Sequence, residues 1–321
     1  MRTATTAPGR PRIKHYGEYA LLRVLLGVLR HLPLRVSLWC ARRLGDVAFD
    51  LLRLRRRVTL ENLHRAFGGE LGDAERRRVA RRTYRNFGIS FVEFALFASQ
   101  HVEQLAARVR LRGAEHLCAA AASGRGVIYL TAHAGSWEIL GATLGFHDRP
   151  LGVVVGDQHN PLVDRFAKQM RRRVGMIVIP TGSALRRCIR LLREGGRLGI
   201  VGDQDAGADG LFLDFCGAAA STPVGPARFA YRTGAAVVFC FDRYVAPGEH
   251  EIVLHPPVYT DPRQPEDVEI RRLMERYNRV LERFVRRHPE AWFWMHRRWK
   301  TPPPQRCQPS THGVVEQESD T

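Results

Sequence analysis

The sequence predicts an α/β protein with a mixed, largely parallel central sheet flanked by helices. Two observations lead to this prediction. Short β-branched or apolar runs alternate with amphipathic segments from about residue 109 to residue 288, which is typical of strands joined by crossover helices. The 321 residues are 45% hydrophobic, which is enough for a substantial core in one large domain or two.

Local signals place each element. Val127 to Leu130 is a buried-strand run that follows turn residues, and Pro161 stands in the first turn of a helix. Gly195 and Gly196 stop another helix. The expected strands are 109–111, 127–130, 151–155, 176–179, 198–201, 235–241 and 251–254, the last alternating like an edge strand. The expected helices are 116–123, 137–144, 161–174, 183–194, 226–233 and 267–288.

The N-terminal region is predicted to be helical and to associate with a membrane. Residues 16–38 are rich in leucine and valine, but arginines interrupt them and Pro33 breaks the pattern, whereas a bilayer span takes about 20 mostly apolar residues. We expect helices lying in the membrane interface, with leucines and Trp39 inward and arginines toward lipid phosphates. The alternative is a soluble amphipathic helix. Residues 47–63 and 73–97 are expected to be further helices rich in arginine.

Differences in amino-acid composition and hydrophobic pattern divide the chain into four parts. We expect a disordered N-terminus over 1–15, the helical, membrane-associated region over 16–105, an α/β core over 106–301 and a disordered tail over 302–321.

The charge and the cysteines restrict the partners. Fifty Lys and Arg residues face 32 Asp and Glu residues, and the net charge of +18 attracts lipid headgroups, nucleic acid or an acidic protein. The six cysteines form no C-x-x-C pair and no zinc spacing, which favours reduced thiols. No glycine-rich phosphate or dinucleotide motif is present, so neither a cofactor nor a metal is expected.

The strongest candidate for chemistry is the stretch GVIYLTAHAGSWEILG, residues 126–141. His133 stands where a strand stops and a helix is about to begin, and ligands of open α/β sheets bind at the carboxyl ends of strands. On one helix, Glu138 would point about 140° away from His133, so the two can meet only if the chain bends, which Gly135 permits. A carboxylate on one imidazole nitrogen would make the other a general base for a hydroxyl.

Spacing alone is weak evidence for this pair. With 13 His and 32 acidic residues, about one chance His-x4-acid match is expected, and His159 with Asp164 is a second match. No strand precedes that second pair, so we interpret it as a helix-start histidine with a solvated carboxylate. A structural histidine near a helix start remains the alternative for His133.

Three further blocks are candidates for a site. Asp203 and Gln204 follow the strand 198–201, and they open onto the crevice of His133 if the two strands are neighbours; the alternative is an Asx-turn. Thr222 to Gly225 precede a helix whose free amides could bind an oxyanion, or simply cap it. Residues 288–300 mix three Trp with basic residues, which suits a surface boundary, or else a C-terminal core plug.

Taken in order, these blocks resemble the bacterial lipid A biosynthesis acyltransferases, with related lysophospholipid and mannoside acyltransferases. The matching pieces are TAHAGSWE, HNPLVDRF, VGDQDAG, TPVGPARFAYRTGAAVV and HPEAWFWMHRRWK, and the region ending in ENLHRAFG looks similar. The resemblance implies that His133 is the catalytic base and Glu138 its orienting carboxylate. The substrate-binding residues expected from it are Asp203, Gln204, Asn160, Thr222 and Gly225.

The resemblance also implies the substrates. The donor would be an acyl thioester, on acyl carrier protein or coenzyme A, and the acceptor a hydroxyl of a membrane glycolipid or phospholipid, without a metal or a covalent acyl-enzyme. Two departures concern the pocket: Ala134 and Ser136 stand where many members have an aromatic residue and Asn, and Val155-Gly156 replaces an aromatic-Arg pair. Arg165 or Arg171 could substitute for that arginine.

The prediction is therefore an O-acyltransferase at the cytoplasmic face of a bacterial inner membrane, acting on a lipid A precursor. His133 would deprotonate the acceptor hydroxyl, and amides near Gly135 to Trp137 or at Gly225 would stabilise the oxyanion. One alternative is a lysophospholipid or phosphatidylinositol mannoside acceptor. Another class is a non-enzymatic basic protein that coats membrane or nucleic acid, but no nucleic-acid-binding signature is apparent and no nucleic-acid partner is expected.

Overall fold

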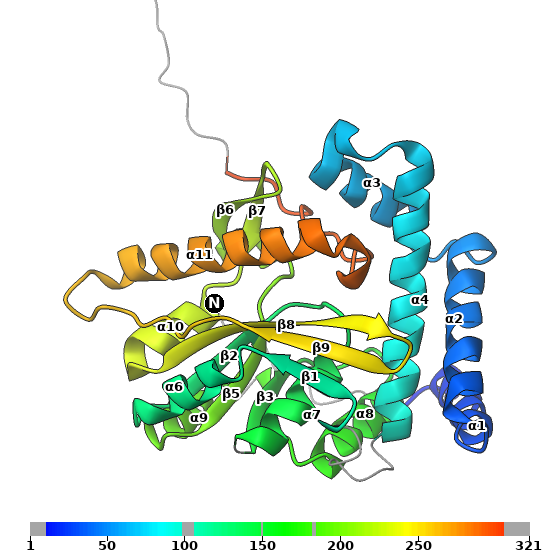
Figure 1. The fold of residues 1–321 in the computed structure, drawn as a ribbon, viewed down its shortest axis with the longest axis horizontal. Coiled ribbons are helices and arrows are strands. Elements are labelled where there is room, and N and C mark those ends of the chain that lie inside the picture. The colour runs from blue at the N-terminus through cyan, green and yellow to red at the C-terminus, as the bar shows by residue number, and fades with distance from the viewer. Residues whose placement is uncertain (1–10, 98–105, 149, 182–183, 305–321) are drawn as a thin grey trace, which may run out of the picture.

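A sheet of seven strands forms the centre of the computed structural model, which describes residues 11–97, 106–148, 150–181 and 184–304 (Figure 1). The strands are β1 Val109–Arg112, β2 Val127–Thr131, β3 Leu151–Val155, β4 Ile177–Pro180, β5 Arg197–Val201, β8 Ala236–Ala246 and β9 Glu249–Leu254. Their order is β1-β9-β8-β2-β5-β3-β4, and only the β8–β9 pair is antiparallel. The predicted mixed, largely parallel sheet is confirmed.

Helices cover both faces of the sheet because successive side chains of a strand point to opposite sides. Ile128 and Leu130 of β2 pack with α9, α10 and α11, which are Ala184–Arg193, Gly225–Thr233 and Glu266–Arg287. Val127 and Tyr129 pack on the other side with α6 and α7, which are Glu115–Ala122 and Trp137–His147. The helix α8, Pro161–Arg173, contacts β4. Because both faces are covered, β2 is buried along its whole length.

The strand β9 occupies an inner position, so the expectation of an edge strand over 251–254 was wrong. It lies between β1 and β8. The polar residues that suggested a solvent-facing side are buried and paired: Glu251 accepts hydrogen bonds from Arg243 of β8, and His250 contacts Asp242 of the same strand. The alternation of polar and apolar residues in β9 therefore reflects charges that are paired inside the fold, and not a face exposed to solvent.

The part of the N-terminal region that the structure describes contains the helices α1 Ile13–Leu29, α2 Leu34–Asp50, α3 Arg56–Phe67 and α4 Asp73–Phe97. A β-carbon added at Gly45 would lie 2.5 Å from the Tyr84 carbonyl oxygen, and one at Gly88 would lie 2.5 Å from the Ala41 carbonyl oxygen, so α2 and α4 pack closely. Figure 1 shows α3 near one end of α4 and α1 near the other. None of the described helices is long and apolar enough to cross a bilayer.

The expected helix over 47–63 is interrupted. The chain leaves α2 after Asp50 and starts α3 at Arg56, and Arg53 and Arg55 adopt positive φ angles of 51° and 53°. This break turns α3 toward the C-terminal segment, where the Asn62 amide donates to the carbonyl oxygens of Trp294 and His296. Tertiary contacts thus decide the boundary against the local helical pattern.

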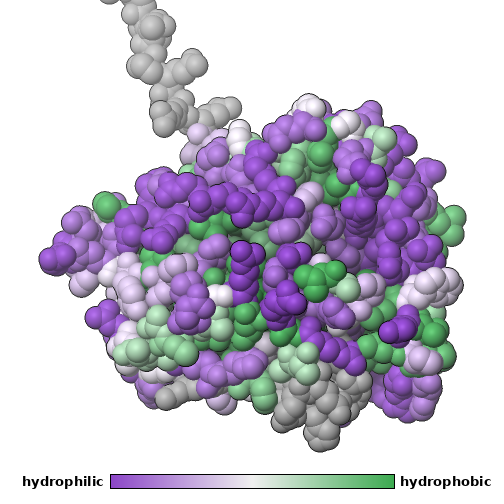
Figure 2. All heavy atoms as spheres, viewed as in Figure 1, coloured by the Kyte–Doolittle hydropathy of each residue, from purple (hydrophilic) through white to green (hydrophobic). Residues whose placement is uncertain are grey.

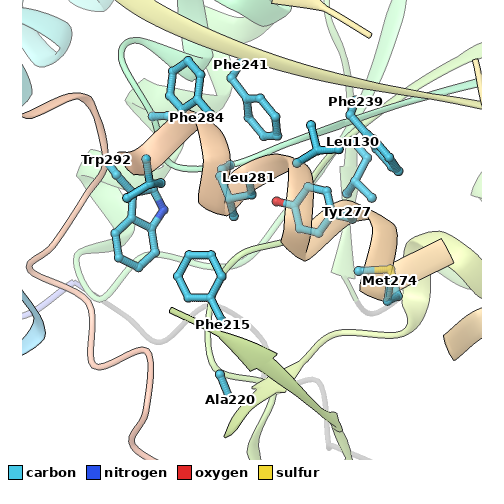
Figure 3. Close-up of a cluster of buried hydrophobic side chains, with 14 of the residues drawn as sticks. Leu130, Phe215, Ala220, Phe239, Phe241, Met274, Tyr277, Leu281, Phe284 and Trp292 are labelled. Atoms are coloured by element: carbon cyan, nitrogen blue, oxygen red, sulfur yellow. The ribbon is translucent and has the colours of Figure 1, made fainter. Parts of the chain in front are cut away.

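A hairpin of β6 Leu211–Phe215 and β7 Ala218–Thr222 is an element that the sequence did not reveal. It packs on α11 from the side opposite to the sheet, so that Phe239 and Leu130 meet one side of Tyr277 and Leu281 while Phe215 meets the other (Figure 3). Short 3-10 turns lie at Gly68–Glu70, Gly207–Asp209 and Pro289–Ala291. The hairpin therefore extends the core beyond the two-faced sheet.

The C-terminal segment after α11 is a core plug, the second of its two predicted interpretations. Trp292, Trp294 and Arg298 are almost fully buried. Of the segments expected to be disordered, residues 13–15 already belong to α1, and residues 1–10 and 305–321 lie outside the described residues. The plug matters for the site because its residues contact the turn that carries His133.

Candidate active site

His133 lies in the turn between β2 and α7, as the sequence predicted. Gly135 bends this turn with a φ of 55°, a left-handed conformation that glycine adopts at little cost. A β-carbon there would lie 2.3 Å from Oδ2 of Asp242, so the turn has no room for a side chain. The Phe293 amide donates to the His133 carbonyl oxygen at 2.9 Å, and Ala134 forms a β-bridge with Trp292. The plug therefore holds the turn from the other side.

Asp203 is the carboxylate that holds the imidazole of His133. It follows β5, which pairs with β2 in parallel, so the predicted common crevice is confirmed. Its Oδ1 lies 2.7 Å from Nδ1 of His133, while its Oδ2 accepts the His133 amide at 3.0 Å and the Trp292 indole N–H at 2.7 Å. The carboxylate is 2% exposed. Three donors from two distant segments thus fix one buried anion.

The electrostatics of this pair fix the protonation pattern. Burial alone would raise the pKa of Asp203, but the charge and hydrogen bonds of His133 and the Trp292 indole hold that pKa below its ordinary value. An ionised carboxylate only accepts, so Nδ1 of His133 carries a proton, and in the neutral form of the ring Nε2 presents its lone pair. The Gln204 amide nitrogen lies 3.3 Å from that Nε2, where an amide donates. His133 is therefore arranged as a base at Nε2.

Glu138 does not hold the imidazole, so the predicted His133–Glu138 contact is corrected. Arg171 of α8 binds the Glu138 carboxylate through Nε at 3.2 and 3.0 Å, and also through Nη2. Glu138 lies in the first turn of α7, which directs it to the α8 side, while the neighbouring strand β5 already supplies an acid to His133. A catalytic role for Glu138 stays a prediction, and any such role involves an ion pair with Arg171.

A cavity of about 410 Å³ runs from His133 between the sheet and α7. Most of its lining residues are apolar or glycine, and polar atoms come from Tyr129, Thr131, His133, Glu138, Gln158, Arg171 and Thr181. Gly156 lines the cavity with open space beside its α-carbon. The apolar and glycine residues of the wall are Leu140, Gly141, Leu151, Val153, Val154, Val155, Met176, Gly199, Ile200 and Val201. This shape suits one long apolar chain whose reacting end is at His133.

None of the five predicted substrate-binding residues lines this cavity, although Asp203 and Gln204 contact the imidazole of His133 beside it. Asn160 caps α8 through Oδ1 and donates from Nδ2 to the His15 carbonyl oxygen and to Glu18, which joins α8 to α1. The Thr222 hydroxyl is fully buried and accepts a hydrogen bond from Arg298 at 2.7 Å. Gly225 begins α10 away from the cavity. The side chains of Asn160 and Thr222 are thus bonded within the fold, and substrate binding at the three positions stays a prediction.

The second His-x4-acid match has a structural role, as interpreted, but its carboxylate is not solvated. Asp164 is 9% exposed; it accepts from the Gln158 amide and pairs with Lys168. His159 packs its ring edge-on against His15. The pair supports the start of α8.

Two of the amides that were expected to stabilise an oxyanion are already occupied. The Gly135 amide donates to the Ala291 carbonyl oxygen at 2.8 Å, and the Ser136 amide donates to Asp242 at 2.6 Å. The amide of Trp137, the first residue of α7, has no hydrogen-bond partner among the described residues. Its ring lies 4.9 Å from that of His133. Of the predicted donors in this turn, Trp137 is thus the one that remains available.

A His–Asp pair beside a cavity at the carboxyl ends of parallel strands is the arrangement of an enzyme site with a histidine base. The model of the bacterial lipid A biosynthesis acyltransferase family matches residues 8–301, and the chain belongs to this family. It is therefore an acyltransferase, which decides against the alternative of a non-enzymatic binding protein.

Individual relatives agree with this membership. The chain is 25% identical over 274 residues to the lipid A biosynthesis lauroyltransferase of Escherichia coli, covering 84% of this chain and 87% of that protein. It is 26% identical over 268 residues to the myristoyltransferase of the same organism, covering 83% and 82%. A phosphatidylinositol mannoside acyltransferase of Mycolicibacterium smegmatis is 30% identical over 129 residues, covering 38% and 42%.

Sequence reasoning missed two parts of the site. The Trp292 indole that binds Asp203 lies in a block that was singled out, but nothing in the sequence assigned its partner. The Asp242 carboxylate under the turn gave no sequence signal, since it sits within an apolar strand. Arg171 was named as a candidate cation, and the structure places it in the cavity wall.

Replacing Asp203 with Asn should lower kcat of acyl transfer by about 10²- to 10⁴-fold, because an amide cannot stabilise the imidazolium that forms when His133 takes a proton. Steady-state kinetics at several pH values measure this, with the exposed Asp209→Asn as the matched control. Glu138→Gln should leave the pH dependence of kcat unchanged. A pH profile altered in Glu138→Gln but not in Asp203→Asn would assign the imidazole to Glu138 instead.

Proposed function

We propose that this chain transfers a fatty acyl group from a thioester to a hydroxyl of a lipid A-type glycolipid at the cytoplasmic face of a bacterial inner membrane. The observation that carries the proposal is the His133–Asp203 pair at the mouth of an apolar cavity. The acceptor class is taken from relatives whose names describe lipid A biosynthesis. The donor would be acyl carrier protein or coenzyme A.

In the proposed reaction, Nε2 of His133 takes the proton of the acceptor hydroxyl as its oxygen attacks the thioester carbonyl carbon. The tetrahedral intermediate collapses as the carbon–sulfur bond breaks, and the imidazolium returns its proton to the departing thiolate. Asp203 stabilises the positive charge on the ring in between. The N-terminus of α7, with the free Trp137 amide, is the nearest available source of positive potential for the oxyanion. No covalent enzyme intermediate is needed.

We assign the cavity to the acyl chain of the donor. Gly141 lies one helical turn beyond Glu138, and Gly199 lies two residues before the end of β5; a β-carbon at either position would approach Met176 or Leu151 of the inner wall. Each methylene buried in such a wall contributes about 0.8 kcal/mol, or roughly fourfold in affinity. The depth of the cavity would therefore set the preferred chain length.

An anionic acceptor fits the mouth of the cavity. Arg171 lines the cavity in an ion pair with Glu138, and Gly156 has open space beside its α-carbon. A lysophospholipid or a mannosylated phosphoinositide offers a similar hydroxyl and phosphate, and the mannoside relative keeps that acceptor as the alternative.

The chemistry is tested by offering the purified chain acyl carrier protein and coenzyme A thioesters of several lengths. The acceptors are a lipid A precursor, a phosphatidylinositol mannoside and lysophospholipids, and products are identified by mass. We expect transfer to the lipid A precursor, a loss of about 10²- to 10⁴-fold in His133→Ala, and a shift to shorter chains in Gly141→Leu, because leucine fills the inner cavity.

Gly69→Leu is the control, since Gly69 is exposed and has open space around it. Full turnover in folded His133→Ala would remove the base from the mechanism. An unchanged chain-length preference in Gly141→Leu would exclude the cavity as the acyl site. Transfer only to lysophospholipids or to the mannoside would replace the acceptor.

The surface of α1 and α2 is our proposed membrane contact. Large apolar side chains are exposed there among arginines, which is the composition of helices that lie in a membrane interface. Figure 2 shows hydrophobic side chains among hydrophilic ones at the edge where these helices lie. Arg43 lies over the ring of the exposed Trp39 at 5.9 Å. The exposed apolar and aromatic residues of the two helices are Ile13, Tyr16, Leu21, Val24, Val28, Val36, Trp39, Leu44 and Val47, and Leu51, Leu52 and Leu54 follow α2.

Replacing Val28 and Trp39 with Ser should weaken binding to vesicles of anionic phospholipid by about 10-fold or more, since burying each side chain contributes about 1.5–3 kcal/mol. Sedimentation with vesicles measures the binding. Val268→Ser is the matched control, because Val268 is 47% exposed on α11, outside the proposed contact. Equal binding of the double variant and the control would contradict the assignment of this face.

A further inference from the structure

A fully buried polar network lies beneath the turn that carries His133. Asp242 of β8 accepts the Ser136 amide at 2.6 Å through Oδ2, and the same oxygen lies 2.9 Å from Nδ1 of His250 on β9. Nε2 of His250 lies 3.3 Å from Glu93 of α4. Glu93, Asp242 and His250 are 0–1% exposed. The network thus joins α4 to the active-site turn through the sheet.

The two ends of the network are closed by hydroxyl groups. Tyr244 donates to Oε2 of Glu93 at 2.7 Å, and the Ser90 hydroxyl of α4 donates to that of Ser136 at 3.1 Å. Burial would lower the pKa of His250, but the charges and hydrogen bonds of Asp242 and Glu93 outweigh it and raise that pKa to about 10. His250 is therefore protonated at neutral pH, and each of its two ring N–H groups faces a carboxylate oxygen.

Such a cluster is an expensive way to stabilise a core. Burying ions costs several kcal/mol each, and apolar groups of similar volume are often at least as stable. Its remaining oxygen, Oδ1 of Asp242, is buried without a hydrogen-bond partner among the described residues. Stability alone therefore does not explain this cluster. Its position does, because it lies directly under the active-site turn. The Gly135 α-carbon is so close to Asp242 that an added β-carbon would clash with that side chain.

We propose that Glu93, His250 and Asp242 are positioning residues that hold the turn so that Nε2 of His133 and the free Trp137 amide of α7 face the same reacting carbon. Asp242 acts on the turn directly, because it accepts the Ser136 amide next to the start of α7. His250 orients Asp242, and Glu93 orients His250 from α4. Asp203, which follows β5, fixes the orientation of the His133 ring. The network fixes the backbone of the turn at Ser136.

The test uses Asp242→Asn and Glu93→Gln in the full chain, assayed well below each variant's unfolding midpoint. Each amide keeps the volume of the side chain but removes the charge that pairs with His250. We therefore expect kcat of both variants to fall by about 10- to 100-fold with little change in KM. A loss of this size is typical when a residue that orients a site is replaced. Glu269→Gln is the matched control: Glu269 is 2% exposed and paired with Arg272 on α11, away from the turn. It should lose stability but keep kcat.

Hydrogen exchange of the Ser136 amide gives a readout that does not depend on acyl transfer, since the kinetic arm rests on the proposed function. The amide should be protected in the wild type and exchange at least 10-fold faster in Glu93→Gln, which leaves its acceptor in place, and remain protected in Glu269→Gln. Exchange unchanged in Glu93→Gln, or kcat retained in folded Asp242→Asn, would overturn the proposal. If the wild-type protein transfers no acyl group, the proposed function is wrong. The hydrogen-exchange result then still tests whether the network positions the turn.

Discussion

The site depends on one buried carboxylate that serves three donors. Asp203 binds the ring and the backbone amide of His133 and the indole of Trp292, so it joins β2, β5 and the C-terminal plug at a single point. Hydrogen bonds to an ionised acceptor are about twice as strong as neutral ones, and removing a partner from a buried charge costs several kcal/mol. The active arrangement is therefore also a constraint on the fold, because none of the three segments can shift alone.

Charge is handled differently on the two sides of His133. On one side, Asp203 balances the ring directly. On the other, Glu138 is committed to Arg171, which places an internally neutral ion pair in the wall of the cavity. An isolated carboxylate there would disfavour an apolar chain, whereas a bidentate pair keeps both charges satisfied. The ion pair can thus lie in the lining beside the apolar residues.

The sequence was most informative where local signals and chemistry coincide. Val127 to Leu130, Gly135 and the following helix could be predicted because strand composition, a glycine turn and a helical pattern are local. The partner of His133 could not be decided, because it depends on β5 lying beside β2, a long-range fact. Spacing favoured Glu138, although helix geometry turns that side chain away. The Asp242 cluster escaped notice because paired charges inside a sheet look like solvent-facing residues, as in β9.

The most direct measurement is the protonation of the His133 ring, from ¹⁵N chemical shifts of histidine in the free protein near neutral pH. The two ring nitrogens of a neutral imidazole are distinct, and the proton lies on the one that its partner accepts from. The account predicts a proton on Nδ1 and a bare Nε2, with this preference weakened when Asp203 is replaced by Asn. A neutral ring with its proton on Nε2 would contradict the assignment of that nitrogen as the base.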